Sequence, residues 1–312
     1  MISTLEAICW RKWLKIVIFI LAVGFYASYA AQNFANIPSF QWRAASIAIG
    51  FVSVMLVVFI IFISGVIWLF LLRDHGFRPT WHQSQVIFSI TQFGKYIPGN
   101  IGQYFGRVLM AREIGIPASV TANTMLIEIL WGAGVGAGLT LISLIFFVDG
   151  RALGFGFGPV ELGLVIPLLM FLPWLVVNLV NRFTPKLAKR LSGGSLIVAP
   201  RLTTALVVAL IFVANFGIMG IILKFQAVWF FDVTGGTVLQ LACLFAVAWL
   251  AGNIVPGAPG GLGVREAVMV VVLSPVLGAG AATGLSLTLR LTTILGDLVA
   301  FAMGVIGRKY GG

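Results

Sequence analysis

The decisive stretch is FGKYIPGNIG, residues 93–102, and it has a counterpart in NIVPGAPGGLGVRE, residues 253–266. Each stretch lies inside a long apolar segment and interrupts it with a Pro-Gly pair. Proline removes a backbone donor and glycine permits positive φ, so we expect no helix to run through either stretch. Lipid cannot satisfy the freed backbone groups, so a break at membrane depth must be buried in protein or line a wet cavity. The expected hinge residues are Pro98, Gly99, Pro256, Gly257, Gly260, Gly261 and Gly263.

The composition is that of an integral membrane protein. Of 312 residues, 60% are hydrophobic and only 9% are charged, whereas a soluble chain has roughly 25% charged residues. The net charge is +11, and the basic residues lie mainly in short loops between apolar segments. Their role there is better explained by membrane orientation and by contact with anionic lipid headgroups than by binding of nucleic acid. The two cysteines are far apart in the sequence and predict no disulfide framework.

The apolar segments predict an all-α membrane fold in one transmembrane domain, residues 1–312. A spanning helix needs about 20 apolar residues. Six continuous segments are expected to cross the membrane, at residues 14–31, 44–72, 121–148, 160–180, 202–230 and 281–306. The two interrupted segments, about 85–110 and 238–276, are expected to form broken re-entrant helical hairpins that add no net crossing.

The distribution of lysine and arginine predicts the orientation. With six crossings, one side receives only three basic residues, Arg43, Arg151 and Lys224. The other side receives Arg11, Lys12, Lys15, Arg73, Arg78, Arg112, Arg182, Lys186, Lys189, Arg190, Arg201, Arg308 and Lys309. Because the basic side of a membrane protein faces the cytoplasm, we expect both termini to be cytoplasmic.

The order of the segments predicts an inverted repeat. Span, span, broken hairpin, span occurs in residues 1–150 and again in 151–312. Three crossings separate the hairpins, so the first must enter from the cytoplasm and the second from outside. Such a repeat places the substrate site at the repeat interface, near the middle of the bilayer.

The breaks also create helix N-termini inside the membrane. Asn100 is a plausible N-cap for a half-helix that runs to Met110, and a second half-helix is expected to begin near Val264. Bare amide groups and partial positive charge at such ends bind anions. The alternative is that these sites are hinges without a ligand.

Charged and polar side chains in the embedded segments are the candidate site. Each charge would cost about 2.5–3.5 kcal/mol at mid-helix, so it must face a cavity or a partner. Internal pairing, for example of Glu128 with Arg107 and of Asp297 with Arg290, is the structural alternative. Four basic residues against three acidic ones leave one cation over, for which an anionic ligand is the complement. The candidate substrate-binding residues are Lys95, Asn100, Gln103, Arg107, Arg265, Glu266 and Arg290. The candidates for proton or charge coupling are Glu128, Glu266 and Asp297.

The segments KYIPGN, residues 95–100, with Arg107, and PGGLGVRE, residues 259–266, resemble those of the lysylphosphatidylglycerol synthase/flippase family, in its membrane part. The resemblance covers nearly the whole chain. It implies translocation of a lipid with an anionic or modified headgroup, in a bacterial or archaeal membrane. By motif position it implies that the conduit residues are Lys95, Asn100, Arg107, Arg265 and Glu266. Bifunctional members carry a cytosolic aminoacyltransferase domain after the membrane part. We expect none after Gly312, so only the flippase half of the resemblance is carried over.

We therefore predict a flippase that moves a phosphate-bearing lipid, a phospholipid or a polyprenyl-phosphate-linked lipid, between leaflets of the plasma (inner) membrane without ATP hydrolysis. The main alternative is a secondary transporter or channel for a small water-soluble anion, which fits the architecture equally well. A membrane-embedded transferase is a third alternative, against which the lack of a recognisable nucleophile–base pair argues.

No catalytic residue, metal or cofactor is expected, because the sequence has no Gly-x-x-x-x-Gly-Lys-Ser/Thr loop, no Cys/His cluster and no Gly-x-Ser-x-Gly elbow. The expected partners are membrane lipids with anionic headgroups, and nucleic acid is not expected. A homodimer and cooperation with separate lipid-modifying enzymes stay open.

Overall fold

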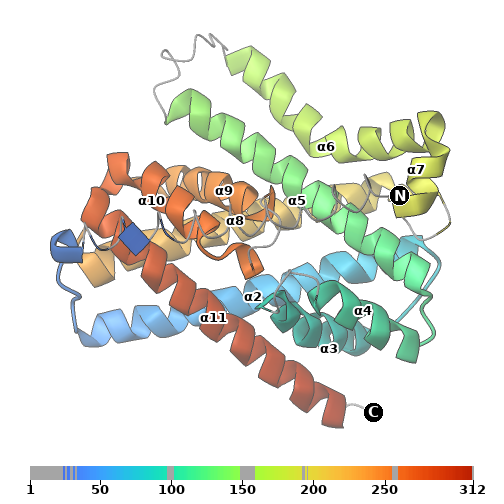
Figure 1. Cartoon of the computed structure of the whole chain (residues 1–312), viewed down its shortest axis with the longest axis horizontal. Helices are drawn as coiled ribbons and strands as arrows, with labels where there is room; N and C mark the ends of the chain where they lie inside the picture. Colours follow the sequence, from blue (N-terminus) through green and yellow to red (C-terminus); the bar gives the residue numbers. More distant parts are fainter. Residues whose placement is uncertain are drawn as a thin grey trace, which may run out of the picture.

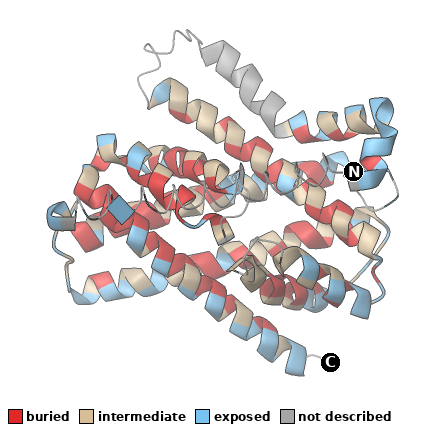
Figure 2. Ribbon diagram, viewed as in Figure 1, coloured by how far each residue is buried: buried red, intermediate tan, exposed pale blue. Residues whose placement is uncertain are grey.

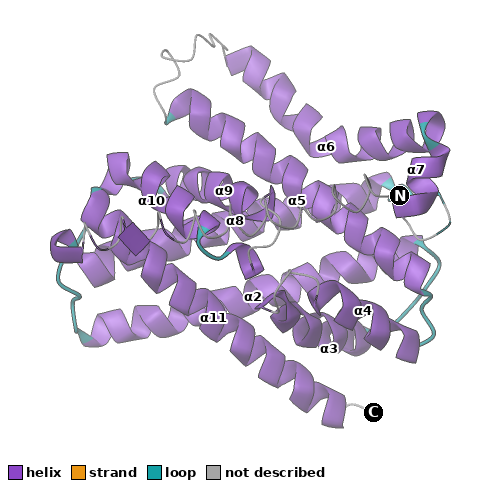
Figure 3. Ribbon diagram, viewed as in Figure 1, coloured by secondary structure: helices purple, strands orange, loops and turns teal. Residues whose placement is uncertain are grey.

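A computed structural model describes residues 34–96, 102–147, 159–191, 196–254 and 259–310, together with Gly24, Ala27, Ser28, Ala31 and Gly194. For residues 34, 159–170, 191, 254 and 259 it describes the backbone alone. All regular secondary structure in the described residues is helical (Figure 3). Pro98, Gly99, Asn100, Pro256 and Gly257, which the sequence marks as break or site residues, lie outside the described residues.

Among the residues that the structure describes, four helices are long and apolar enough to cross a membrane. They are α2 (Ala44–Asp74), α5 (Ala118–Phe146), α8 (Leu202–Phe231) and α11 (Ala279–Tyr310). Each matches a predicted span to within a few residues, because about 20 consecutive apolar residues is a strong signal. The predicted span 160–180 is a helix, α6 (Pro159–Phe183), followed by the short α7 (Pro185–Leu191). Most of the predicted span 14–31 lies outside the described residues.

Small residues let the long helices approach closely. A Cβ on Gly220 of α8 would lie 2.5 Å from the backbone oxygen of Val238, at the start of α9 (Val238–Ile254). A Cβ on Gly132 of α5 would lie 3.0 Å from the rings of Phe212 and Trp249. Glycines at these positions therefore bring α5, α8 and α9 into one core, and Figure 2 shows buried residues gathered where these helices face one another.

The first predicted break is present. Helix α3 (Trp81–Gln92) starts with a capping box, in which Thr80 and Gln83 each accept the other's backbone N–H at 3.1 and 2.9 Å. It ends in a short 3-10 turn, η2 (Phe93–Tyr96), and the chain resumes as α4 (Gly102–Glu113), which packs against α3. The helix after the break thus runs three residues beyond the predicted end at Met110.

The second predicted break is present as well. Helix α9 ends at Ile254, a 3-10 turn η4 follows (Pro259–Gly261), and α10 (Val264–Leu277) then packs back against α9. The φ angles of Gly260, Gly261 and Gly263 are 56°, 73° and 80°. Only glycine adopts such angles without strain, so the three glycines turn the chain where the sequence placed hinges.

The two helix pairs lie toward opposite ends of the molecule, and their broken tips meet in its middle (Figure 1). The tips η2 and η4 are in contact with each other, and η2 also contacts α11. Polar contacts tie helix ends together at each end of the molecule. At one end they join Arg201 N to Asp74 Oδ2 and Arg308 Nη2 to Glu113 Oε2, both at 2.9 Å, and at the other Gln41 N to Phe230 O at 2.9 Å.

Candidate functional site

A cavity of about 490 Å³ lies where the two broken tips meet the long helices. It is lined by residues from α2, α3, α4, α5, α8, α9, α10, α11 and both tips. Charged side chains that line it are Lys95, Arg107, Glu128, Arg265, Arg290 and Asp297. Residues from both halves of the sequence therefore share one polar space.

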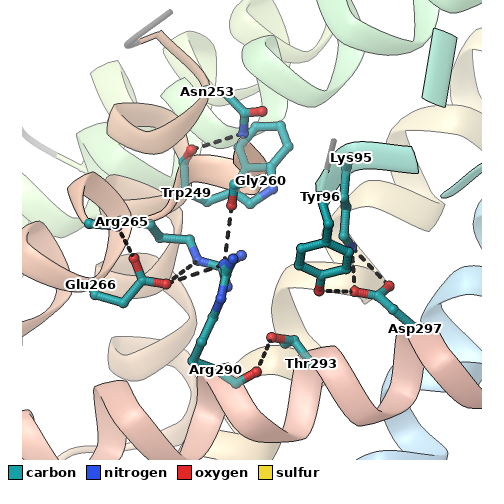
Figure 4. A network of polar contacts seen from close by, with 11 residues as sticks. Lys95, Tyr96, Trp249, Asn253, Gly260, Arg265, Glu266, Arg290, Thr293 and Asp297 are labelled. Atoms are coloured by element: carbon teal, nitrogen blue, oxygen red, sulfur yellow. Dashed lines mark hydrogen bonds and ion pairs between the residues drawn. The ribbon is translucent and has the colours of Figure 1, made fainter. Parts of the chain in front are cut away.

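The first tip is fastened to α11 by Asp297. Lys95 Nζ lies 2.8 Å from Oδ1 and 2.7 Å from Oδ2 of Asp297, and the Tyr96 hydroxyl donates to Oδ2 at 2.5 Å (Figure 4). The Asp297 side chain is almost fully buried, whereas that of Lys95 is 22% exposed. The 3-10 turn η2 ends at Tyr96, beside Asp297 of α11. The side chains of Lys95 and Tyr96 can therefore both reach Asp297 from the first tip.

The second tip is fastened to α11 by Arg290. Its Nη1 donates to the backbone oxygen of Gly260 at 3.2 Å and lies 3.3 Å from Glu266 Oε1 (Figure 4). The guanidinium also lies 5.5 Å from the centre of the Tyr96 ring, within the range of a cation–π interaction. Arg290 thus touches both tips at once.

Glu266 positions the two arginines of this region. Its Oε2 accepts the backbone N–H of Gly263 at 2.8 Å and so caps the first turn of α10. Its Oε1 lies 3.3 Å from Arg290 Nη1 and 3.9 Å from Arg265 Nε. A glutamate three residues after the N-cap is favoured because it satisfies a free amide and complements the helix dipole. Glu266 is buried behind the cavity wall and is not among the cavity's lining residues.

A separate ion pair lines another part of the cavity. Arg107 of α4 lies with Nη1 2.6 Å from Glu128 Oε2 of α5. Its guanidinium lies 4.3 Å from the centre of the Phe88 ring and 5.6 Å from that of Trp68. Arg107 is buried, so aromatic faces and one carboxylate take the place of water around it.

Part of the cavity lining is exposed on the flank of the bundle. Two lining residues, Ile129 inside α5 and Asn253 beside the second tip, are exposed. Neither lies at an end of the molecule. Nearby α4, which lends Arg107 to the cavity, carries exposed Phe105 and Leu109. Within the described residues, the exposed part of the cavity lining therefore lies on the flank of the bundle, beside apolar surface.

The structure brings most of the sequence-predicted site residues together. Lys95, Gln103, Arg107, Arg265 and Arg290 line the cavity, as do Glu128 and Asp297. Glu266 lies directly behind them. Asn100 lies outside the described residues.

Of the two internal pairs considered as the structural alternative, one is present and the other is not. Arg107 pairs with Glu128, as that alternative has it. Asp297 pairs with Lys95 instead of Arg290, because the first tip reaches the buried face of α11 and Arg290 turns to Glu266.

Sequence reasoning missed several neutral residues of the cavity. Tyr96 and Tyr104 line it, as does Asn215, whose amide donates to Ser64 Oγ at 3.1 Å. Tyr96 follows Lys95 directly in the break motif, so its position was a usable signal. Asn215 lies in an apolar run of α8 and carried no signal beyond its polarity.

Comparison with known proteins gives one family. The family model described as lysylphosphatidylglycerol synthase TM region matches residues 12–300. Comparison with curated proteins gives no match. The matched range contains both broken stretches and every residue of the cavity.

Proposed function

From the premise that this chain belongs to the lysylphosphatidylglycerol synthase TM region family, and is a multi-pass membrane protein, we propose that it is a flippase for a phosphate-bearing anionic lipid. The phosphate-bearing headgroup passes through the polar cavity while the acyl or prenyl tails stay in the bilayer. Transport needs no ATP hydrolysis and no catalytic residue of this chain.

One observation carries this proposal: more basic than acidic residues line the cavity, and its exposed lining residues lie on the flank of the bundle, beside apolar surface. In its described lining, four cations, Lys95, Arg107, Arg265 and Arg290, face two carboxylates. A membrane-embedded surplus of positive charge calls for an anion. We take the exposed lining residues Ile129 and Asn253 to mark a sideways opening, which suits a ligand whose tails remain in lipid.

The architecture that we propose is an inverted repeat, residues 1–150 and 151–312, with six crossings and two re-entrant hairpins. Two hairpins at opposite ends of the molecule, with touching tips, support it. The end that carries Arg73, Arg112, Arg182, Arg201 and Arg308 is proposed to face the cytoplasm of a bacterial or archaeal inner membrane. An inside-negative potential then favours outward movement of an anion by about 2.3 kcal/mol per charge per 100 mV.

Translocation in proteoliposomes tests the proposal. Fluorescent phosphatidylglycerol in the inner leaflet is protected from an impermeant quencher unless it is moved. We expect wild-type protein to expose this pool, and Arg290→Gln to slow exposure at least about tenfold, because an oriented hydrogen-bonded charge contributes about 1.5–3 kcal/mol. Arg308→Gln, which removes a half-exposed arginine at the end of α11, is the matched control and should retain wild-type rates.

Two results would contradict the proposal. Protected lipid that stays protected with wild-type protein, while the same vesicles take up soluble anions, would identify a small-anion transporter instead. Equal rates for wild type and Arg290→Gln would show that the headgroup does not pass this cavity.

A further inference from the structure

Arg290 is held by one nitrogen of its guanidinium and keeps one edge free. Nη1 donates to the backbone oxygen of Gly260 and forms the ion pair with Glu266. The Arg290 side chain is buried, with 9% of the residue exposed. Its Nε and Nη2 atoms have no hydrogen-bond partner among the described residues. These two nitrogens form the edge of a guanidinium that donates side by side to two oxygens of one phosphate or carboxylate. A buried donor without a partner costs free energy, so the free edge points to an oxyanion.

The space in front of this edge lies between the two tips. A Cβ built on Gly260 would lie 3.6 Å from Arg290 Nη2 and 3.8 Å from Lys95 Cγ. Any side chain at position 260 would therefore enter the space between the Arg290 guanidinium and the stem of Lys95. The absence of a side chain at Gly260 leaves that space for a ligand oxygen.

The charged side chains around this space determine how much negative charge on a ligand they can neutralise. In the described part of the chain, Lys95, Arg265 and Arg290 meet the carboxylates of Asp297 and Glu266. Three positive charges and two negative charges leave one positive charge over. An uncompensated buried charge is costly. A ligand with one negative charge balances the site, whereas a second negative charge has no counterpart.

We propose that Asp297 and Glu266 are built-in counter-ions that make this site selective for a phosphodiester, which carries one negative charge, over a phosphomonoester or a diphosphate. The free edge of Arg290 holds the phosphate, and Asp297 sets the charge selectivity. A phosphomonoester carries about −1.5 to −2 at pH 7. The inference rests on the proposed function, since it takes the ligand to be a phosphate group. It favours diester lipids over a polyprenyl monophosphate or diphosphate.

Binding of matched short-chain lipids tests the charge rule separately from transport. Dihexanoyl phosphatidylglycerol is a diester and dihexanoyl phosphatidic acid is a monoester with the same tails. Their dissociation constants for detergent-solubilised protein are measured by titration calorimetry. We expect wild type to prefer the diester at least about tenfold, the equivalent of about 1.4 kcal/mol. Arg308→Gln is expected to keep that preference.

Three charge variants make the test specific. Asp297→Asn raises the surplus of positive charge at the site from one to two. It is expected to reduce the preference for the diester over the monoester about tenfold. Arg265→Gln lowers the surplus to zero and is expected to widen the preference. The double variant Lys95→Gln/Asp297→Asn returns the surplus to one and is expected to restore the wild-type ratio, even where overall affinity falls. A purely structural role of the Lys95–Asp297 pair predicts no such restoration.

The outcomes separate this inference from the proposed function. An unchanged ratio in Asp297→Asn and Arg265→Gln, or a double variant that keeps the ratio of Asp297→Asn, would overturn the charge rule and leave the flippase proposal standing. Dimethyl phosphate and monomethyl phosphate serve as soluble probes of the same chemistry. If they are bound and transported with the diester preference while no lipid is moved, the charge rule stands and the lipid assignment fails.

Discussion

Glu266 lies between the start of α10 and two arginines. It accepts an amide at Gly263 and faces Arg290 and Arg265, and it is 4% exposed. Removing one partner of a buried ion pair typically costs about 3–5 kcal/mol, because the other charge stays buried. We expect Glu266→Gln to lower the melting temperature in detergent by several degrees. Glu113→Gln, in an exposed pair with Arg308, should leave it nearly unchanged, since such pairs contribute about 0–1 kcal/mol. Equal shifts would show that Glu266 has no positioning role.

For individual residues, the sequence predicts which side chains belong to the candidate site better than it predicts which residues they contact. The cost of charge in an apolar segment singles out Lys95, Arg290 and Asp297. Their pairing depends on tertiary placement, since Lys95 and Asp297 are 202 residues apart. Glu266 was predicted to touch the substrate, whereas its contacts in the structure are with Gly263 and two arginines. Its spacing of three residues from Gly263 was a readable capping signal.

The elements that decide the fold are the two broken hairpins, and the first depends on Gly94. A Cβ on this residue would lie 2.6 Å from the backbone N of Gln103, so α4 could not close onto η2. We expect Gly94→Ala to destabilise the protein by about 1–3 kcal/mol, the usual cost of overpacking, and to slow lipid movement. Gly217→Ala, in α8 where a Cβ meets nothing within 4 Å, should be neutral or slightly stabilising. Thermal unfolding of both variants is the measurement, and a stable, active Gly94→Ala would contradict this account of the tip.

Most element boundaries could be predicted because apolar length is a direct physical requirement of the bilayer. The long helices α2, α5, α8 and α11 agree with the predicted spans to within a few residues. The prediction missed the end of α4 at Glu113, although Ala111, Arg112 and Glu113 favour a helix and Gly115, with a φ of 79°, follows its end. The 3-10 turns at the tips were also not predicted, because proline and glycine mark a break without fixing its geometry.

For the whole molecule, the two hairpins are expected to be accessible from opposite sides of the membrane. Arg78 precedes α3, and Thr234 precedes α9. In a background with Cys9→Ser and Cys243→Ala, we expect an impermeant maleimide to label Thr234→Cys in intact cells. Arg78→Cys and Arg308→Cys should react only after permeabilisation. Labelling of Arg78→Cys and Thr234→Cys from the same side would refute the inverted repeat and, with it, the proposed orientation.

Arg290 and Asp297 lie seven residues, or about two turns, apart on α11. One anchors the second tip and the other anchors the first. A small rotation of α11 about its own axis therefore displaces both anchors in the same movement. A headgroup bound between the two anchors, as proposed, would therefore act on both hairpins through one shared helix.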